Sequence, residues 1–472
     1  MLAKPESDEF SELKGLPTSF FRANRERYCK NIERLLPNLD QNSILILKGG
    51  SEISKYDSDT VYFHFYQEAN IYYLTGVTEP EIVAILDIKS AKMTLFSNQL
   101  PEEYKIWMTV ISNEEFGKKY DCEVFDKEKL NDYIKSRDPK NILLLEGNND
   151  YSTLPVTTMN LDLKGEFEYL NARILHENLI YEILKDTRTR KSEDELRLMT
   201  YICDITVFAH KIMQKSCKPG LFERDLETTF MNTLNINYHT RHWAYPCIGG
   251  AGCNSAILHY ENNDKLLKDG DFFLADMGIR FCNYTSDVTC TFPVNGKFTK
   301  RQKDIYNLVL KSNRETMNMI RPGVAYLDMD KKSKMVILEG LQSLGFIKSN
   351  YTVDELYGSG IHLLFMPYSL GHFVGIEVHD VGRSISFKPQ QILEKGNVIT
   401  VEPGIYFVEF TMEKAFKDES KSKFLNIDLI KQYYDFGGVR IEDDVIVTDT
   451  GFINMTDTVP RTVEDIEDLM KS

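Results

Sequence analysis

Short apolar runs alternate with an amphipathic stretch through the first part of the chain. Apolar runs bounded by turn residues predict buried strands, and apolar positions at helical spacing predict a helix. Strands that alternate with helices are typical of an α/β domain, which we expect at residues 1–184. The strand-like runs are SILILKGG (43–50), EIVAILDI (81–88), KMTLF (92–96) and NILLLEG (141–147), and the helix-like stretch is RANRERYCKNIERLL (22–36).

A different pattern begins near residue 185. SEDE (192–195) is an S-x-x-E capping box, and the apolar positions after it recur every three or four residues until KPG (218–220). TKRQ (299–302) begins a second such helix, which ends at RPG (321–323). Capping boxes begin helices, and Pro and Gly end them. Because each Pro-Gly is followed by another helix and then by strand-like segments, we expect residues 185–472 to form two related halves packed about one sheet. The fold class is α/β, with α+β character in this second domain.

Acidic and imidazole side chains interrupt strand-like segments of the second region. DFFLADMGIR and YTSDVTCTFPV are typical of a hairpin, which carries Asp276 and Asp287. LGHFVGIEVHD contributes His372, and Glu402 and Glu442 lie beside β-branched runs in NVITVEPGIYF and GGVRIEDDVIVT. An ionised carboxylate is costly to bury unless it is paired or binds a metal. Four such acids in a predicted core therefore need a shared explanation.

Two divalent cations would supply that explanation. Four carboxylates carry roughly −4 and two divalent ions roughly +4, so the charges nearly cancel in a buried site. Paired cations of this kind lie about 3.5 to 4 Å apart and lower the pKa of bound water to about 7. One imidazole among oxygen ligands favours hard to borderline ions, with manganese ahead of zinc.

Each of these residues also has a structural interpretation. Asp276 alone would suit a turn or cap, and His372 alone would suit a buried histidine with satisfied hydrogen bonds. Glu402 precedes Pro-Gly and would suit the start of a turn, while Glu442 would suit an ion pair with Arg440. None of the five is decisive alone. Their occurrence together in one domain, in the order Asp, Asp, His, Glu, Glu, favours a metal centre.

Composition excludes several classes of partner. The 472 residues carry a net charge of −15, which disfavours binding to nucleic acid or to an anionic membrane. The opening MLAKPESDEF is polar and acidic, and no run of about 18 apolar residues follows. We therefore expect a cytoplasmic protein. The eight cysteines are scattered without a C-x-x-C pair, so we expect free, reduced thiols.

Several long motifs run in order along nearly the whole chain: FYQEANIYYLTGVTEPE, CNSAILHY, LADMG, YTSDVTCTFPVNGKFT, LGHFVGIEVHDVG, TVEPGIYF, GGVRIEDDVIVT and VPRTVEDIE. In these motifs the chain resembles the prolidases, the Xaa-Pro dipeptidases of the metallopeptidase family that also holds aminopeptidase P and methionine aminopeptidase. The resemblance implies a creatinase-like N-terminal domain (1–184) and a pita-bread metallopeptidase domain (185–472) with internal pseudo-twofold symmetry. It also implies a homodimer with two divalent metal ions, Mn²⁺, in each active site.

The same resemblance implies the roles of the metal ligands. Asp276 would hold one metal ion, and His372 and Glu402 the other. Asp287 and Glu442 would bridge the two ions.

The resemblance further implies how a dipeptide with C-terminal proline is bound and cleaved to a free amino acid and proline. Glu402 would take a proton from the attacking hydroxide and pass it to the leaving imide nitrogen, and His379 would stabilise the oxyanion. His259 would orient the substrate near the proline carboxylate. The remaining candidates for substrate binding are Arg440, Tyr245, Ile248, Trp107 and Lys388. Arg440 would alternatively support the metal ligands, and core packing is the alternative for Ile248. Trp107 would approach the active site of the neighbouring subunit.

Two features depart from the prolidase pattern. The segment RSISFKPQQILEKGNVIT (383–400) is shorter than its counterpart, and Lys388 falls where an arginine clamps the dipeptide carboxylate. A lysine lacks the bidentate fork of an arginine, so we expect either weaker dipeptide selectivity or a clamp at Arg383. Tyr368 in FMPYSLGH stands where prolidases usually have histidine, so the local hydrogen bonding must differ.

These departures leave two alternatives to a dipeptidase. An Xaa-Pro aminopeptidase would share all five ligands and would accept longer peptides because it lacks a carboxylate clamp. A non-catalytic pita-bread binding protein is the alternative of another class. Relatives of that kind have lost ligands, whereas all five remain here, and the full set of motifs favours the dipeptidase.

Overall fold

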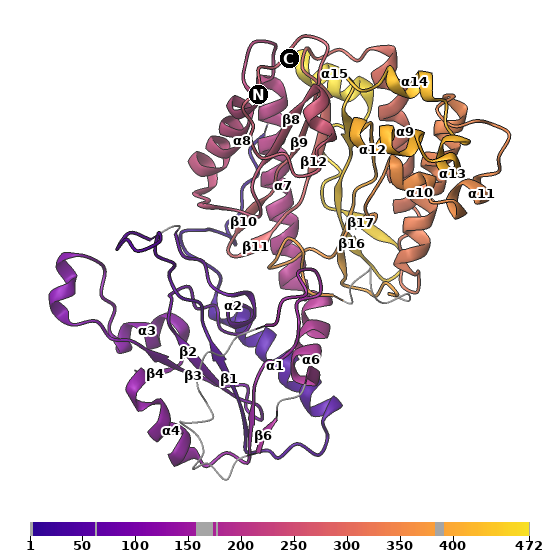
Figure 1. The fold of residues 1–472 in the computed structure, drawn as a ribbon. Coiled ribbons are helices and arrows are strands. Elements are labelled where there is room, and N and C mark those ends of the chain that lie inside the picture. Colours follow the sequence, from indigo (N-terminus) through magenta and orange to yellow (C-terminus); the bar gives the residue numbers. More distant parts are fainter. Residues whose placement is uncertain (1–2, 62–63, 157–172, 176–177, 383–390, 472) are drawn as a thin grey trace. The chain divides into compact units, whose positions relative to one another are not determined.

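The computed structural model describes residues 3–61, 64–156, 173–175, 178–382 and 391–471 (Figure 1). The chain forms two compact units, one of Gly15–Arg188 and the other of Met1–Lys14 together with Thr189–Ser472. The division after Arg188 comes a little later than the end of the first domain that we expected at residue 184.

The first described residues belong to the larger unit rather than to the N-terminal domain in which the sequence placed them. The Tyr238 hydroxyl donates to the carbonyl of Pro5, and the backbone N–H of Cys282 donates to the Glu12 carboxylate at 2.6 Å. These polar contacts between distant parts of the chain have no periodic signal in the sequence.

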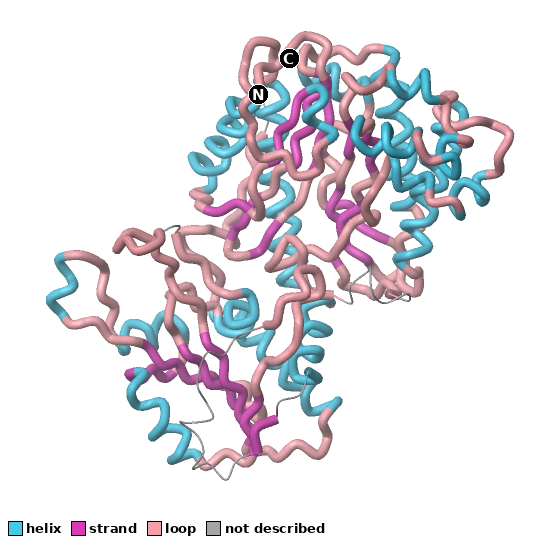
Figure 2. The backbone as a smooth tube through the Cα atoms, in the orientation of Figure 1, coloured by secondary structure: helices cyan, strands magenta, loops and turns pink. Residues whose placement is uncertain are grey.

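The N-terminal unit contains a mixed six-stranded sheet in the order β4-β3-β2-β1-β5-β6, with helices beside it (Figures 1 and 2). The pairs β1–β2 and β2–β3 are antiparallel, and β1–β5, β3–β4 and β5–β6 are parallel. The four predicted strands are confirmed as β1, β2, β3 and β5. The elements of this unit are α1 (Thr18–Leu35), β1 (Ser43–Lys48), α2 (Ala69–Thr75), β2 (Val83–Asp87), β3 (Met93–Ser97), η1 (Glu102–Ile106), α3 (Asn113–Tyr120), β4 (Glu123–Asp126), η2 (Lys127–Lys129), α4 (Leu130–Arg137), β5 (Asn141–Leu143), β6 (Arg173–Leu175) and α6 (Asn178–Thr189).

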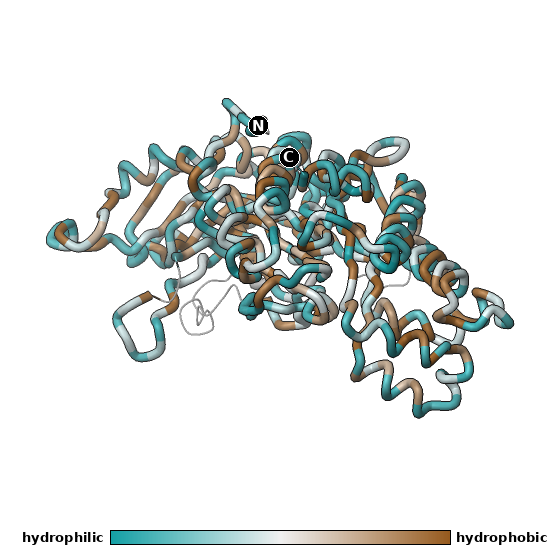
Figure 3. The backbone as a smooth tube through the Cα atoms, turned by 90° about the horizontal axis from the view of Figure 1, so that it is seen from above, coloured by the Kyte–Doolittle hydropathy of each residue, from teal (hydrophilic) through white to brown (hydrophobic). Residues whose placement is uncertain are grey.

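Apolar side chains of the central strands form the core of this unit. Helix α1 contacts α2 and buries one face, at spacings of three and four residues that include Phe21, Tyr28 and Ile32. Such alternation of hydrophobic and hydrophilic positions along the helices is visible in Figure 3. The hydroxyl of Tyr28 donates to the carbonyl of Ile180 at 3.1 Å, which ties α1 to α6. The core residues are Ile44, Ile46, Val83, Ile85, Phe96, Leu130, Ile134, Ile142 and Leu144.

The larger unit repeats a helix-helix-strand order, as the sequence predicted. Its elements are α7 (Glu193–Ser216), α8 (Glu223–Tyr238), β7 (His242–Trp243), β8 (Ile248–Ala251), η3 (Gly252–Ala256), β9 (Phe272–Asp276), β10 (Ile279–Phe281), β11 (Tyr284–Thr285), β12 (Thr289–Pro293), α9 (Lys300–Met317), α10 (Tyr326–Ser343), α11 (Val353–Gly358), η4 (Ile361–Leu364), β13 (Val398–Val401), β14 (Gly404–Tyr406), α12 (Glu409–Phe416), α13 (Glu419–Ser422), α14 (Ile427–Lys431), β15 (Gly438–Arg440), β16 (Asp443–Val447), β17 (Phe452–Asn454) and α15 (Val463–Lys471).

Both predicted capping boxes are present in the structure. The Ser192 side chain accepts from the backbone N–H of Glu195 at the start of α7, and Thr299 accepts from that of Gln302 at the start of α9. Each pair of helices lies beside strands of its own half: α7 and α8 beside β8, β9 and β12, and α9 and α10 beside β16 (Figure 1).

The strands of the two halves form separate three-stranded sheets, β12-β9-β8 and β13-β16-β17, rather than the one sheet that we expected. The halves meet through single backbone contacts, such as the bond from the Glu442 N–H to the Thr289 carbonyl at 3.2 Å, instead of a continuous ladder. None of the eight cysteines, all of which lie in the described ranges, forms a disulfide. Within the described ranges no helix has both the length and the apolar composition that a membrane span requires.

Candidate metal centre

Four acidic side chains lie at the ends of two antiparallel strand pairs. Asp276 ends β9 and pairs with Thr289, the first residue of β12, so that Asp287 lies just before β12. The predicted hairpin is therefore confirmed. Glu402 immediately follows β13 and Glu442 immediately precedes β16, and these two strands pair antiparallel. Each half thus presents two acids where its strand pair ends, Asp276 and Asp287 in the first half and Glu402 and Glu442 in the second.

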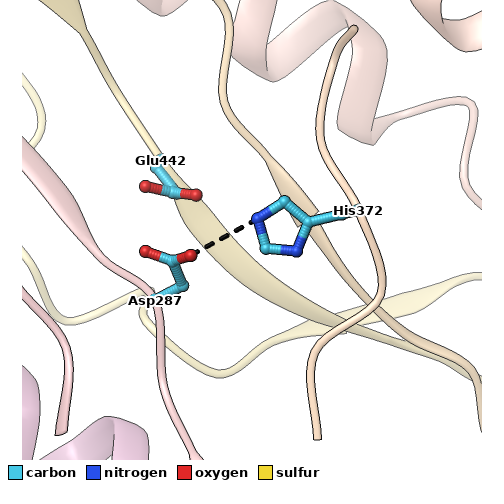
Figure 4. A group of neighbouring side chains, drawn as sticks. All are labelled: Asp287, His372 and Glu442. Atoms are coloured by element: carbon cyan, nitrogen blue, oxygen red, sulfur yellow. Dashed lines mark ion pairs between the residues drawn. The ribbon is translucent and has the colours of Figure 1, made fainter. Parts of the chain in front are cut away.

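His372 lies beside β13 and points its ring at the acids (Figure 4). Its backbone N–H donates to the Thr400 hydroxyl at 3.0 Å, and its carbonyl accepts from the Thr400 N–H at 2.8 Å. The ring Nδ1 lies 3.0 Å from the Phe373 carbonyl, which can only accept, so Nδ1 carries the hydrogen. Nε2 is left with its lone pair 3.4 Å from an oxygen of Asp287 and 3.4 Å from an oxygen of Glu402.

Three of the predicted ligands form a compact group that could hold a cation. Asp287, His372 and Glu442 each offer one ligand atom, and these atoms lie within 4.8 Å of one another (Figure 4). All three residues are buried. Two carboxylates and one imidazole are donors that suit a divalent cation of hard or borderline character.

Burial and mutual repulsion act strongly on the acids of this group. Desolvation, followed by the charge of neighbouring carboxylates, raises the pKa of Asp287, Glu402 and Glu442 well above their usual range. Burial lowers the pKa of His372, which keeps the imidazole neutral. A cation among these groups would favour ionised carboxylates and a neutral imidazole, which are the forms that bind metal. The residues present therefore fit a divalent metal.

Asp276 is held by two polar side chains, a partly buried tyrosine and a buried arginine. The Tyr245 hydroxyl lies 2.6 Å from a carboxylate oxygen of Asp276 and 2.5 Å from one of Asp287. The Arg440 guanidinium donates to the other Asp276 oxygen at 2.6 Å. The Tyr245 hydroxyl thus contacts two of the predicted ligands, and its expected place in the wall of the substrate pocket stays a prediction. Ile248 pairs with Asp276 across β8 and β9, and its side chain is buried.

Two further histidines lie in this region, His379 beside His372 and His259 near His379. The ring centroid of His379 is 4.3 Å from that of His372, with the planes inclined at 69°. Although His379 is partly exposed to solvent, the protein around its ring, followed by repulsion from His372 and His259, lowers its pKa to about 4. His379 is therefore neutral at neutral pH and can donate a hydrogen bond. His259 is exposed to solvent.

Three residues that contact the predicted ligands or Arg440 were not found by sequence reasoning. The Thr289 hydroxyl donates to Glu442 at 2.6 Å, the Thr400 hydroxyl donates to Glu402 at 3.1 Å, and Tyr406 accepts from Arg440 at 2.7 Å. Both threonines lie two positions from an acid in a strand-like run, where side chains share a face. That spacing is a signal by which they could have been found. Tyr406 has no comparable signal.

Two further residues, Trp107 and Lys388, were predicted to bind substrate. Trp107 belongs to the N-terminal unit, where 80% of its surface is exposed. Lys388 and the alternative clamp Arg383 lie outside the described residues. The roles of all three stay predictions.

Family models agree with the arrangement of strands and acids. Residues 197–449 match the metallopeptidase family M24 model, and residues 21–143 match the aminopeptidase P N-terminal domain. The first match spans more than half of the chain. The chain belongs to metallopeptidase family M24. This membership confirms the predicted two-domain architecture, with a pita-bread domain after the N-terminal α/β domain.

Members of family M24 resemble this chain over almost its whole length. The chain is 37% identical to the Xaa-Pro dipeptidase of Homo sapiens over 96% of its own length and 94% of the relative's. It is 31% identical to a probable Xaa-Pro aminopeptidase of Pyricularia oryzae, over 92% and 93% of the two chains. Aminopeptidase P from Escherichia coli, solved with the inhibitor Pro-Leu, superposes with a TM-score of 0.80 and 28% identity, covering 97% of this chain and 99% of that one.

Proposed function

We propose that the chain is an Xaa-Pro dipeptidase that releases a free amino acid and proline at a centre of two manganese ions. One observation carries the proposal: a buried group of Asp287, His372 and Glu442 in a family M24 chain that is 37% identical to a human Xaa-Pro dipeptidase over 96% of its length. The identity to named dipeptidases is higher than that to named aminopeptidases, which supports the dipeptide as substrate.

Five side chains would hold the two cations. We assign Asp276 to one ion, and His372 and Glu402 to the other, with Asp287 and Glu442 shared between them. The distances of 3.4 Å from His372 Nε2 to Asp287 and to Glu402 support this set. Four oxygen-bearing side chains and one imidazole favour manganese over softer ions.

The reaction is the hydrolysis of the peptide bond before proline. When bound, the cations supply Lewis acidity and lower the pKa of water towards neutrality. Glu402 takes a proton from the attacking water as its oxygen bonds to the carbonyl carbon. The C–N bond then breaks as that proton passes to the proline nitrogen, so that no net proton is consumed.

Neutral imidazoles would stabilise the developing negative charge and orient the substrate. We propose that His379 donates to the oxyanion, since its lowered pKa keeps it neutral and its ring is next to that of His372. His259 would meet the proline carboxylate from its exposed position. Ile248 would contribute apolar surface, and Arg440 would act through Asp276 rather than on the substrate.

Proline gives a reason for a dedicated peptidase. Its nitrogen carries no N–H and its ring fixes φ, so an enzyme that holds substrate through extended backbone hydrogen bonds handles this bond poorly. Catalysis through bound cations and neutral imidazoles does not require such hydrogen bonds. The homodimer, the approach of Trp107 to a neighbouring active site, and the cytoplasmic location stay predictions.

A second candidate, an Xaa-Pro aminopeptidase, is favoured by one set of observations. Fungal relatives at 31% identity are named probable Xaa-Pro aminopeptidases, and solved neighbours with a TM-score of 0.80 are aminopeptidase P. The two activities differ in whether the carboxylate of proline is clamped. Lys388 and Arg383 are the candidates for that clamp, and their roles are open to direct test.

The test is a comparison of Gly-Pro with Gly-Pro-Gly. Full-length protein is stripped of metal and reloaded with manganese, and hydrolysis of both peptides is measured beside the Asp276→Asn variant. Cleavage of Gly-Pro with little cleavage of Gly-Pro-Gly supports the dipeptidase. Preference for Gly-Pro-Gly supports the aminopeptidase, and manganese binding without cleavage of either peptide supports the non-catalytic binding protein. Asp276→Asn should lose cleavage in either enzyme.

A further inference from the structure

A chain of hydrogen bonds runs from Arg440 to the backbone of Glu402 through two tyrosines. The Arg440 guanidinium donates to the Tyr406 hydroxyl at 2.7 Å. The hydroxyls of Tyr406 and Tyr368 lie 2.8 Å apart, and the Tyr368 hydroxyl lies 3.1 Å from the carbonyl oxygen of Glu402. Arg440 also donates to Asp276 at 2.6 Å, so the chain of bonds links an acid of one half to an acid of the other.

The chemistry of the partners fixes the direction of every bond in this chain. A guanidinium can only donate, so the Tyr406 oxygen accepts from Arg440. A carbonyl can only accept, so the one hydrogen of the Tyr368 hydroxyl points to Glu402. The Tyr368 oxygen must then accept the hydrogen of Tyr406. Each hydroxyl thus accepts once and donates once, and hydrogen bonds arranged in series in this way strengthen one another.

The surroundings make room for this pair of tyrosines. A Cβ on Gly404 would lie 2.5 Å from the Tyr368 hydroxyl and 2.7 Å from that of Tyr406, too close for any side chain. The two rings pack at 5.8 Å between centroids, inclined at 63°. Tyr368 also packs against the apolar cluster that contains Ile248 and Tyr406. Its ring is therefore fixed by packing as well as by its hydroxyl.

We infer that Tyr368 is a positioning residue, which holds the backbone of Glu402 and orients Tyr406 and Arg440 so that Glu402 and Asp276 keep the geometry that binds metal. The inference rests on the proposed function in so far as it concerns catalysis. Tyr368 does not touch the reacting atoms; it acts through Glu402 and through Arg440. Replacement by phenylalanine keeps the ring but removes the donor to Glu402 and the acceptor for Tyr406.

Two substitutions break the chain of bonds at neighbouring links. We expect Tyr368→Phe to lower kcat for the better of the two peptides and manganese affinity by about 10- to 100-fold, the usual effect of losing a residue that orients a metal ligand. KM should change less than about twofold, because the ring surface remains. Tyr406→Phe should shift kcat and manganese affinity in the same direction, and the double variant should lose no more than the larger single loss, because groups that act as a unit are not additive.

Tyr28→Phe is the matched control. The Tyr28 hydroxyl also donates to a backbone carbonyl at 3.1 Å and is fully buried, but it lies in the N-terminal unit. We expect this control to lower the Tm and to leave kcat and manganese affinity unchanged. It reports the general cost of removing a buried tyrosine hydroxyl.

The measurements are manganese affinity by calorimetry on metal-depleted full-length protein, Tm, and steady-state kinetics. Losses of kcat and manganese affinity in Tyr368→Phe that Tyr28→Phe does not share support the inference. The inference is overturned if Tyr368→Phe keeps kcat and manganese affinity within about twofold of the parent. It is also overturned if the losses of the two single variants multiply in the double variant. If the unaltered protein binds manganese but cleaves neither peptide, the proposed function fails, and the comparison of manganese affinities still decides the role of Tyr368.

Discussion

Arg440 and Asp276 form a buried ion pair, with 2.6 Å between the guanidinium nitrogen and the carboxylate oxygen. Arg440 ends β15, whereas Asp276 ends β9 in the other half of the larger unit. Two other N–H groups of the guanidinium donate to the hydroxyls of Thr289 and Tyr406. The Arg440 guanidinium thus orients side chains from both halves. A lysine lacks the planar arrangement of N–H groups that makes these three bonds.

Arg440→Met should be strongly destabilising, because removal of one partner leaves a buried charge without compensation. We expect a loss of about 3 to 5 kcal/mol in the metal-free protein. Arg197→Ala is the control, since Arg197 pairs with Glu9 at the surface, where such pairs contribute little to stability. Denaturant unfolding measures both. Equal, small losses in the two variants would contradict the role given to Arg440.

Thr400→Val tests the hydroxyl that joins two predicted ligands. The Thr400 oxygen accepts from the His372 N–H and donates to Glu402, and valine keeps the shape while losing both bonds. We expect manganese affinity to fall by about 10- to 100-fold. Thr316→Val, which loses only a bond to a carbonyl one turn earlier in α9, should leave that affinity unchanged. Calorimetric titration with manganese distinguishes the two, and equal affinities would rule out the role of Thr400.

The stability of the metal-free protein should fall as pH rises above about 4. Burial raises the pKa of Asp287, Glu402 and Glu442 in the folded state, so folded protein binds more protons than unfolded protein above the unfolded pKa of about 4. The loss continues until pH passes the raised pKa values of the folded protein. Buried Asp444, whose pKa is raised to about 7, adds to the same trend.

Manganese should reverse that trend. The ion binds the ionised acids and must displace their protons. For each proton displaced, the apparent affinity for manganese rises about tenfold per unit increase in pH. We therefore expect the Tm increase caused by manganese to be larger at pH 8 than at pH 6. Thermal unfolding at both pH values, with and without the ion, measures this. An increase that does not vary with pH would show that manganese does not bind at the acids.

Gly404→Ala should disturb the tyrosine pair without removing any polar group. The added Cβ would lie 2.5 Å from the Tyr368 hydroxyl and 2.7 Å from that of Tyr406, so at least one ring must move. We expect a lower Tm and a kcat loss similar to that of Tyr368→Phe. Gly451→Ala is the control because no atom lies within 4 Å of its Cβ position. Activity equal to the parent in Gly404→Ala would mean that the pair tolerates displacement.

The sequence predicted those features that depend on local pattern. Ser192 and Thr299 cap helices because their partners lie three residues away, and the alternation around Asp276 and Asp287 predicted a hairpin that the pairing of β9 with β12 confirms. The metal ligands were expected from acids in apolar runs and from the resemblance to a known family. These side chains approach one another because the ends of their strands lie close together in the fold.

The contacts that support the acids could not be predicted in the same way. Tyr406 and Arg440 lie 34 residues apart in sequence, and Arg440 and Asp276 lie 164 apart. Hydrogen bonds between residues so far apart in the sequence depend on how the two halves pack, and no periodic pattern in the sequence predicts them. The same reason explains why the contacts of Tyr245 with two carboxylates, and the association of the first residues with the larger unit, were not predicted.

The most direct test of the account is the titration of manganese into metal-free, full-length protein, with Gly-Pro hydrolysis and bound metal measured at each addition. We expect hydrolysis to appear as binding approaches about two ions per chain, as a two-cation site requires. Asp287→Asn should abolish it, whereas Asp449→Asn, which alters an exposed ion pair with Lys395, should not. Hydrolysis by metal-free protein, or full activity of Asp287→Asn, would contradict the account.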